Sequence, residues 1–245
     1  SDSSCTNDTG GVTVAVDLSR FAEVYESSIL QLDKLTPHQQ EKLQQCLSSE
    51  WKRLHLLGPA GSGKTHVGLN VMLNTLRSDA KARVLFVAKT EALAQFVVGW
   101  LCVRLLGSAD VSLSPATAAL LERVEVVYPK KGESMPSVHR RYSCSHGRLW
   151  PSPAEARAKG EQRRHDLVVV DESHHFYADS ATQQEIEQRF VSSAPRVRLL
   201  SDGSQSTAID NDGTSETTPA ADAMTVVLSE VVRCSRRVVE AAKAF

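Results

Sequence analysis

The sequence lacks the features of membrane-spanning and secreted proteins. No stretch of its 245 residues approaches the ~18–20 uninterrupted apolar residues that a membrane helix needs. The first four residues, Ser-Asp-Ser-Ser, contain no Met, no basic segment and no apolar core of a signal peptide. We therefore expect an intracellular protein without a membrane partner, and the start without Met suggests a fragment or a processed form.

Cysteine is scarce and scattered. The cysteines form neither a disulfide framework nor a CxxC metal motif, and they are Cys5, Cys46, Cys102, Cys144 and Cys234. This usage favours reduced, structural thiols in an intracellular protein. The alternative is a metal site at His139, Cys144 and His146, but three ligands at this spacing match no common zinc pattern, so the thiol interpretation is preferred.

The chain also lacks an excess of charge of either sign. Its 28 Lys and Arg against 29 Asp and Glu give a net charge of −1, which predicts no overall attraction to polyanions. With 41% hydrophobic and 23% charged residues, the composition excludes global disorder and is typical of a soluble globular protein with a sizeable core. The length allows one large domain or two small ones.

What the sequence does contain is an alternation of short apolar runs and helical patterns. The predicted strands are Arg53–Leu57, Arg83–Ala88, Val124–Tyr128, Leu167–Val170, Val197–Leu200 and Thr225–Leu228. The predicted helices are Phe21–Leu32, Pro37–Trp51, His66–Leu76, Glu91–Leu106 and Ala181–Val191. Apolar strands that alternate with helices indicate an α/β fold with a parallel sheet flanked by helices.

Three segments do not follow this alternation. Residues 1–20 are polar and predict a flexible arm before a single domain at 21–245. Pro129–Arg164 is interpreted as an insertion or long loop with one helix at Pro153–Gln162. Thr207–Ala223 is rich in Thr, Asp and Ala and predicts an exposed loop.

A phosphate-binding motif follows the first predicted strand. Gly58–Thr65 matches GxxxxGK[ST] in full and lies between a strand and a helix, as the P-loop requires. Its backbone N–H groups and the helix N-terminus attract phosphate oxygens. Lys64 is expected to reach the β- and γ-phosphates and the Thr65 hydroxyl to ligate Mg²⁺, so ATP and Mg²⁺ are the predicted cofactors. The predicted nucleotide-binding residues of the loop are Gly58, Pro59, Ala60, Gly61, Ser62, Gly63, Lys64 and Thr65.

Two carboxylates follow another apolar strand. Asp171 and Glu172 come directly after Leu167–Val170, at the strand end where open α/β sheets bind ligands. Asp171 is expected to hold Mg²⁺ through water, and Glu172 to polarise the attacking water as general base. The alternative, that the pair only caps the next helix, is less favoured because of the upstream P-loop. Two carboxylates favour hydrolysis over nucleotide binding alone.

The order of these motifs resembles the first RecA-like domain of superfamily 1 helicases and their relatives, over residues 35–245. Beyond motifs I and II, Leu35–Gln39 is similar to the Q motif and Val87–Ala94 to motif Ia. Leu199–Ser206 is similar to motif III, and Leu228–Ser235 to the segment LxxNYRS. Asp171–His175, read as DESHH, is also similar to Schlafen-type helicase-like ATPases.

The resemblance implies a role for each matching residue. Gln39 would read adenine, Thr90 would contact single-stranded DNA or RNA, Gln205 would report the nucleotide state, and Arg233 would contact the γ-phosphate. Each of three residues also has a simpler interpretation. Gln39 could be a helix-surface residue, Gln205 an exposed loop residue, and Arg233 a surface arginine beside two others.

The sequence also departs from the family. Motifs V and VI belong to a second RecA-like domain, so the resemblance predicts that domain as a partner and slow turnover without it. Thr207 and Ala208 follow motif III, so no aromatic residue is present there to stack on a base. In addition, Ser201 stands where the family has Gly, and Val232 stands where it has Tyr. The predicted function is the ATPase half of a helicase-like motor acting on nucleic acid. The alternative is a P-loop switch or signalling module without translocation, whereas the Asp171–Glu172 pair disfavours a P-loop kinase.

Overall fold

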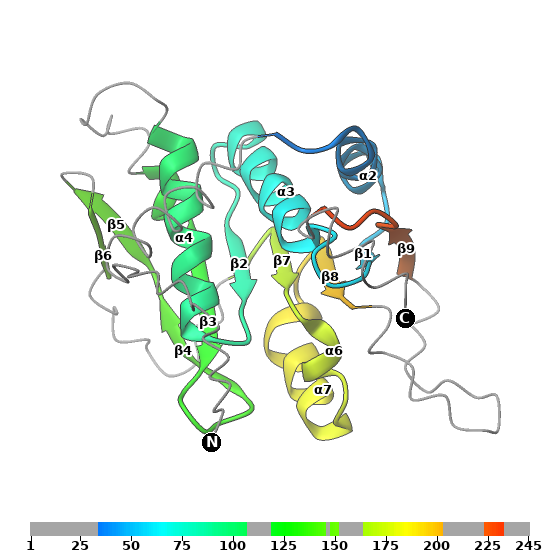
Figure 1. The fold of residues 1–245 in the computed structure, drawn as a ribbon. Coiled ribbons are helices and arrows are strands. Elements are labelled where there is room, and N and C mark those ends of the chain that lie inside the picture. The colour runs from blue at the N-terminus through cyan, green and yellow to red at the C-terminus, as the bar shows by residue number, and fades with distance from the viewer. Residues whose placement is uncertain (1–33, 107–118, 146–147, 152–163, 203–222, 233–245) are drawn as a thin grey trace, which may run out of the picture. The chain divides into compact units, whose positions relative to one another are not determined.

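The computed structural model describes residues 34–106, 119–145, 148–151, 164–202 and 223–232 (Figure 1). Its strands are β1 (Arg53–Leu57), β2 (Val84–Val87), β3 (Val124–Pro129), β4 (Pro136–Arg140), β5 (Tyr142–Ser145), β6 (Arg148–Pro151), β7 (Leu167–Val170), β8 (Val197–Ser201) and β9 (Ala223–Val227). The main sheet has the order β4-β3-β2-β7-β8-β1-β9. Only the β3–β4 pair in it is antiparallel, so the predicted α/β fold with a largely parallel sheet is confirmed.

The helices described are α2 (Pro37–Ser48), α3 (Lys64–Ser78), α4 (Glu91–Leu106), α6 (Ser173–Phe176), α7 (Ser180–Ile186) and the π-helix η1 (Glu187–Val191). The prediction for Glu91–Leu106 has the observed bounds, and α2 ends three residues before the predicted Trp51. The predicted helix Ala181–Val191 divides into α7 and η1. The predicted helix Phe21–Leu32 lies outside the described residues.

Helices cover both faces of the central strands. A Cβ atom placed on Gly68 of α3 would lie 2.8 Å from Leu200 Cδ1 and 3.6 Å from Val169 Cγ1, so α3 packs closely on that face. Neighbouring strand residues point to the opposite face, where they meet α6, α7 and η1. That second cluster includes Val168, Val170, Leu199, Phe176, Ile186 and Phe190. Burial on both faces explains why β2 and β7 are continuous apolar runs.

The predicted insertion at 129–164 contains strands that the sequence pattern did not reveal. β4 extends the main sheet antiparallel to β3, with a register shift at Tyr128 and Pro129. β5 and β6 form a separate two-stranded sheet. The predicted helix Pro153–Gln162 lies outside the described residues, as do residues 1–20 and 207–222 of the predicted arm and loop.

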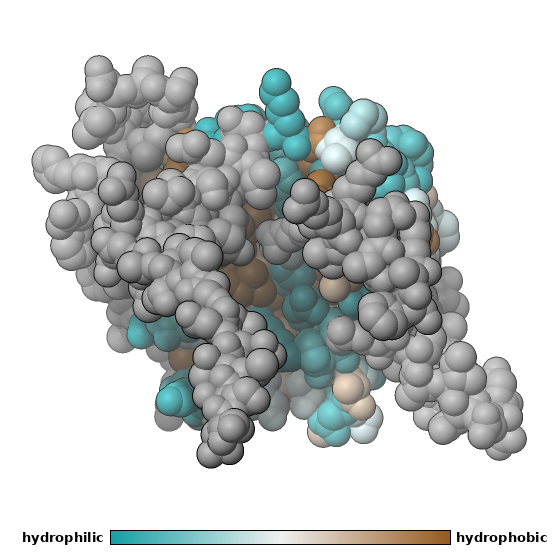
Figure 2. All heavy atoms as spheres, in the orientation of Figure 1, coloured by the Kyte–Doolittle hydropathy of each residue, from teal (hydrophilic) through white to brown (hydrophobic). Residues whose placement is uncertain are grey.

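The surface of the described part is mixed. On the face shown in Figure 2, hydrophilic atoms dominate the margin of the described residues and hydrophobic atoms lie toward the middle. Among the helices of these residues, none combines the length and the apolar character that crossing a membrane requires.

Candidate nucleotide site

Three parallel strands end together at one edge of the sheet. β8 lies between β1 and β7, with Leu57 opposite Ser201 and Leu199 opposite Val170. The residues that follow these strands, Gly58, Asp171 and Asp202, therefore begin at the same edge. This topology brings the two predicted motifs together, as expected for a ligand site in an open α/β sheet.

The loop between β1 and α3 has the backbone that its glycines allow. Gly63 precedes the first turn of α3 with a φ of 89°, which L-residues with a side chain rarely adopt. Gly58 lies so close to a neighbouring segment that a Cβ there would be 2.8 Å from Leu228 O. The loop therefore leads directly into a helix N-terminus, whose free N–H groups favour an anion.

Lys64 lies inside this loop. Its ammonium donates to Gly58 O at 2.7 Å and Pro59 O at 3.1 Å, and the residue is 8% exposed. Ser62 Oγ is buried nearby and has no hydrogen-bond partner among the described residues. A buried cation, an unpaired hydroxyl and a helix N-terminus at one loop fit a phosphate chain, so the residues present suit ATP.

Thr65 and Asp171 meet across the site. Thr65 Oγ1 donates to Asp171 Oδ2 at 2.7 Å, and Asp171 is 1% exposed. Burial raises the pKa of the Asp171 carboxyl to about 6, although hydrogen bonds from Thr65 and from the Glu172 backbone N–H oppose this. A hydroxyl and a carboxylate oxygen side by side are ligands that Mg²⁺ prefers, so the pair also fits the predicted metal.

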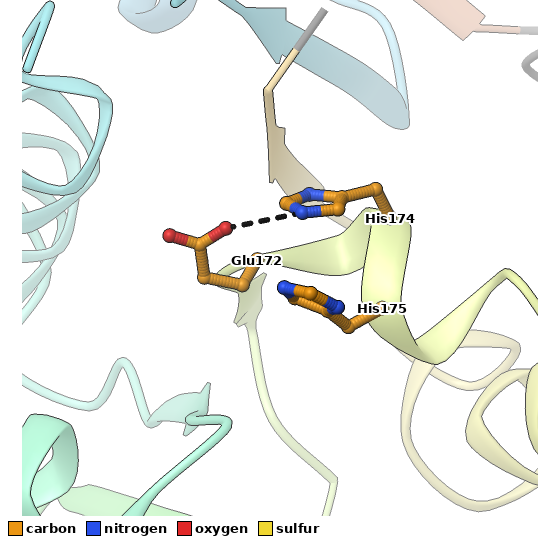
Figure 3. Close-up of side chains that lie close together, drawn as sticks. All are labelled: Glu172, His174 and His175. Carbon is orange, nitrogen blue, oxygen red and sulfur yellow. Dashed lines mark ion pairs between the residues drawn. The ribbon is translucent and has the colours of Figure 1, made fainter. Parts of the chain in front are cut away.

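Glu172 has an unusual backbone for its residue type. With φ 52° and ψ 40°, it is the non-glycine residue with positive φ in the described part of the chain. It precedes α6, and its side chain is 40% exposed, so water can reach the carboxylate. Residues held in this conformation cluster at functional sites. Figure 3 shows the Glu172 side chain directed toward the imidazoles of His174 and His175, with Oε2 3.5 Å from His174 Nε2.

His174 connects the end of β7 to the end of β8. The Asp202 backbone N–H lies 3.4 Å from His174 Nδ1, and Ser173 Oγ donates to Leu200 O at 3.1 Å. The sequence pattern did not predict that His174 links the ends of β7 and β8, although its position in the DESHH sequence, directly after the two carboxylates and Ser173, pointed to the site. Gln205, predicted in the same motif III, lies outside the described residues.

Gln39 is placed against the loop from the side of α2. It is 3% exposed, so it is not a surface residue, and its Nε2 donates to Ser62 O at 2.9 Å. Its Oε1 accepts from Thr36 N at 3.0 Å, which completes a capping box at the start of α2. The structure thus brings Gln39 into contact with the phosphate-binding loop, while its predicted reading of adenine remains a prediction.

The segment after β9 also touches the loop. Leu228 N donates to Leu57 O at 2.7 Å, and Val232 N donates to Gly61 O at 3.0 Å. Ser229 N lies 3.2 Å from His38 Nε2. Arg233, the predicted γ-phosphate ligand that follows Val232, lies outside the described residues.

A separate hollow of about 600 Å³ lies at the ends of β2 and β3. Thr90 lines it together with basic residues, which are Lys89 after β2, Lys130 and Lys131 after β3, and Arg140 at the end of β4. Thr90 Oγ1 also accepts from Leu93 N at 3.2 Å, at the start of α4. The structure therefore places Thr90, for which a nucleic-acid contact was predicted, beside the basic turn after β3, 40 residues further along the sequence. This combination was not predicted, because it depends on β2 pairing with β3.

Comparison with known proteins places the chain in a family. Residues 34–245 match the AAA domain. No match was found among curated proteins. A solved structure of the Orc1 protein of Aeropyrum pernix in complex with DNA is similar, with 13% identity and a TM-score of 0.39. The match covers 88% of this chain and 52% of that one, so this chain spans about half its length, and the likeness is too distant to indicate a function. The AAA match, which spans most of the chain and contains the P-loop, shows that the chain belongs to the AAA domain family of P-loop NTPases.

Proposed function

We propose that the chain carries the ATP-binding and ATP-hydrolysing half of a superfamily 1 helicase-like motor that acts on nucleic acid. The observation that supports this most directly is the 2.7 Å contact between Thr65 Oγ1 and Asp171 Oδ2, with buried Lys64 and solvent-accessible Glu172 beside it. A loop that only binds phosphate has no need of a water-accessible carboxylate next to the metal-binding one.

The proposed chemistry divides among the residues by position. Lys64 and the loop N–H groups bind the phosphates. On binding, Lys64 exchanges its present contacts with Gly58 O and Pro59 O for phosphate oxygens. Thr65 and Asp171 hold Mg²⁺, which neutralises charge on the phosphates when bound. Glu172 orients a water and accepts its proton. Gln205 and Arg233 would complete the site through the roles that the superfamily 1 resemblance implies.

The hollow beside Thr90 supports nucleic acid as the partner. Lys89, Lys130, Lys131 and Arg140 supply positive charge against Glu91 and Glu133 in its lining. In a chain with a net charge of −1, such a local concentration of cations is what a phosphodiester backbone requires.

One observation favours the second candidate, a nucleotide-dependent switch without translocation. Tyr128, the aromatic residue of the hollow's lining, is 4% exposed and donates to Glu91 Oε1 at 3.1 Å. A buried ring cannot stack on a base, and stacking is a main source of single-strand affinity.

ATPase assays with and without single-stranded DNA or RNA distinguish the two candidates. The motor predicts ATP turnover, slow in this chain alone, and binding of a labelled oligonucleotide that charge reversal at Lys130 and Lys131 weakens. Lys81→Glu is a matched control, because this exposed lysine lies before β2, at the other end of the strand. Turnover with no binding and no response to either nucleic acid would leave the switch as the better account.

A further inference from the structure

Three potential metal ligands gather at the start of α6. They are Glu172, His174 and His175, and one ligand atom from each lies within 4.8 Å of the other two (Figure 3). The two imidazoles come from neighbouring residues, with ring centroids 4.1 Å apart. One carboxylate oxygen of Glu172 faces the imidazoles, and the dashed line in Figure 3 marks its contact with His174.

The spacing suits a tetrahedral ion. Metal–ligand bonds of about 2.0–2.1 Å give a ligand–ligand edge of about 3.3 Å in a tetrahedron. Glu172 Oε2 and His174 Nε2 are 3.5 Å apart, which is close to that edge before any adjustment. The other two edges both involve His175, whose ligand atom lies within 4.8 Å of the other two, and this exposed side chain has room to rotate toward them.

The ligand set selects the type of metal. Two imidazoles and one carboxylate suit Zn²⁺, and a site with three protein ligands leaves a fourth position for water. Mg²⁺ prefers oxygen ligands in octahedral geometry, which Thr65 and Asp171 offer instead.

We propose that Glu172, His174 and His175 form a Zn²⁺ site that is distinct from the Mg²⁺ site and that occupies the carboxylate of Glu172. The binding itself follows from the geometry of the three side chains. Its consequence rests on the proposed function: a Glu172 carboxylate bound to Zn²⁺ cannot accept a proton from the attacking water, so Zn²⁺ slows hydrolysis while nucleotide still binds.

Two neighbouring groups oppose the ion. Coordination through Nε2 of His174 places the ring proton on Nδ1, which replaces the 3.4 Å contact from the Asp202 backbone N–H. Lys89 adds positive charge near His175. Both effects limit the affinity, and removal of the Lys89 charge by Lys89→Gln should strengthen Zn²⁺ binding.

Metal titration of the whole chain, freed of metal with a chelator, tests the site without any need for ATP turnover. Co²⁺, as a spectroscopic substitute for Zn²⁺, should give the visible absorption of a tetrahedral ion at one equivalent, and Zn²⁺ should displace it. His175→Ala should weaken Zn²⁺ binding at least ~10-fold, because the site loses one of its three protein ligands. His175→Cys should retain the metal and add a thiolate charge-transfer band, and His38→Ala should bind as the wild type does.

The ATPase assay at saturating Mg²⁺ then tests the consequence. Added Zn²⁺ should inhibit the wild type and Lys89→Gln, and it should leave His175→Ala largely active. The absence of a one-equivalent site, or equal affinity in wild type and His175→Ala, would overturn the proposal. Inhibition that His175→Ala does not relieve would also overturn the link to Glu172. A chain that binds Zn²⁺ in this way but never hydrolyses ATP would instead contradict the proposed function and leave the metal site standing.

Discussion

Replacing Gly63 by alanine should destabilise the domain by about 2–5 kcal/mol, through two effects that can be separated. The first is backbone strain, because a φ of 89° costs an L-residue about 1–2 kcal/mol. The second is steric, because the new Cβ would lie 2.2 Å from Gln39 Nε2. The amide of Gln39 must then move away from Ser62 O, and a buried acceptor without its donor costs about 1–3 kcal/mol.

Gly132 provides the matched control for the first effect. Its φ is 88°, and a Cβ there would meet no atom within 4 Å. Gly132→Ala should therefore show the backbone strain alone, about 1–2 kcal/mol. Urea denaturation of both variants measures the free energy of unfolding, and the difference between them isolates the collision with Gln39.

A double-mutant cycle with Gln39→Ala completes the test. When the amide is absent, the methyl group of Gly63→Ala has nothing to displace, so its cost should fall to that of Gly132→Ala. Equal unfolding free energies for Gly63→Ala and Gly132→Ala in the wild-type background would refute the argument that Gln39 is packed against the loop. A cost of Gly63→Ala that is unchanged in the Gln39→Ala background would refute it as well.

Three further predictions concern the site and its support. Lys64→Ala should abolish productive nucleotide binding, measured with a fluorescent nucleotide, because it removes the buried cation of the loop, whereas Lys81→Ala should bind normally. Glu172→Gln should keep ATP bound but slow hydrolysis at least ~100-fold, and a wild-type rate would remove Glu172 from the mechanism. Burial, with a smaller contribution from Arg53, lowers the pKa of His55 to about 4 from an ordinary 6.5. The unfolded chain thus binds more protons between these pH values, so stability should fall by up to about 3 kcal/mol as the pH drops from 6.5 to 4. The loss should be smaller in His55→Gln, and parallel urea midpoints for the two proteins across that range would contradict the assignment.

The alternation of strands and helices along the central part of the chain was predictable, because its physical cause lies in the local sequence. Apolar runs such as Leu167–Val170 are buried on both faces, and only strands between two helical layers tolerate that pattern. Once the strands are parallel, their carboxyl ends share an edge, so the P-loop and the Asp171–Glu172 pair had to meet. The contact between the P-loop and the carboxylate after β7 could therefore be predicted from the sequence.

The edge of the sheet could not be predicted in the same way. β4 has the sequence Pro-Ser-Val-His-Arg, which contains little apolar alternation and begins with proline. Its strand conformation depends on pairing with β3, where His139 lies opposite Val127 and Nδ1 of His139 is 2.7 Å from Glu125 Oε1. Such a strand is stabilised by its partner rather than by its own pattern, so only the folded sheet reveals it.

The position of Gln39 was predictable in part. The Thr36-Pro37-His38-Gln39 sequence has the spacing of a capping box, and its hydrogen bonds are present at the start of α2. The reach of the same side chain to Ser62, 23 residues away, depends on how α2 packs against α3. The left-handed backbone of Glu172 had no local signal either, because glutamate carries no preference for that conformation.

These non-local contacts share one effect on the phosphate-binding loop, which is that they engage its carbonyl groups. Gly61 O accepts from Val232 N, and Ser62 O accepts from Gln39 Nε2. A carbonyl directed at a phosphate would repel it, so each of these hydrogen bonds keeps a negative end of the backbone dipole occupied elsewhere. These hydrogen bonds hold the loop in shape before nucleotide arrives, so the loop loses less conformational entropy on binding. Gln39 and the segment after β9 can therefore influence nucleotide affinity through the loop backbone, without any contact with the nucleotide.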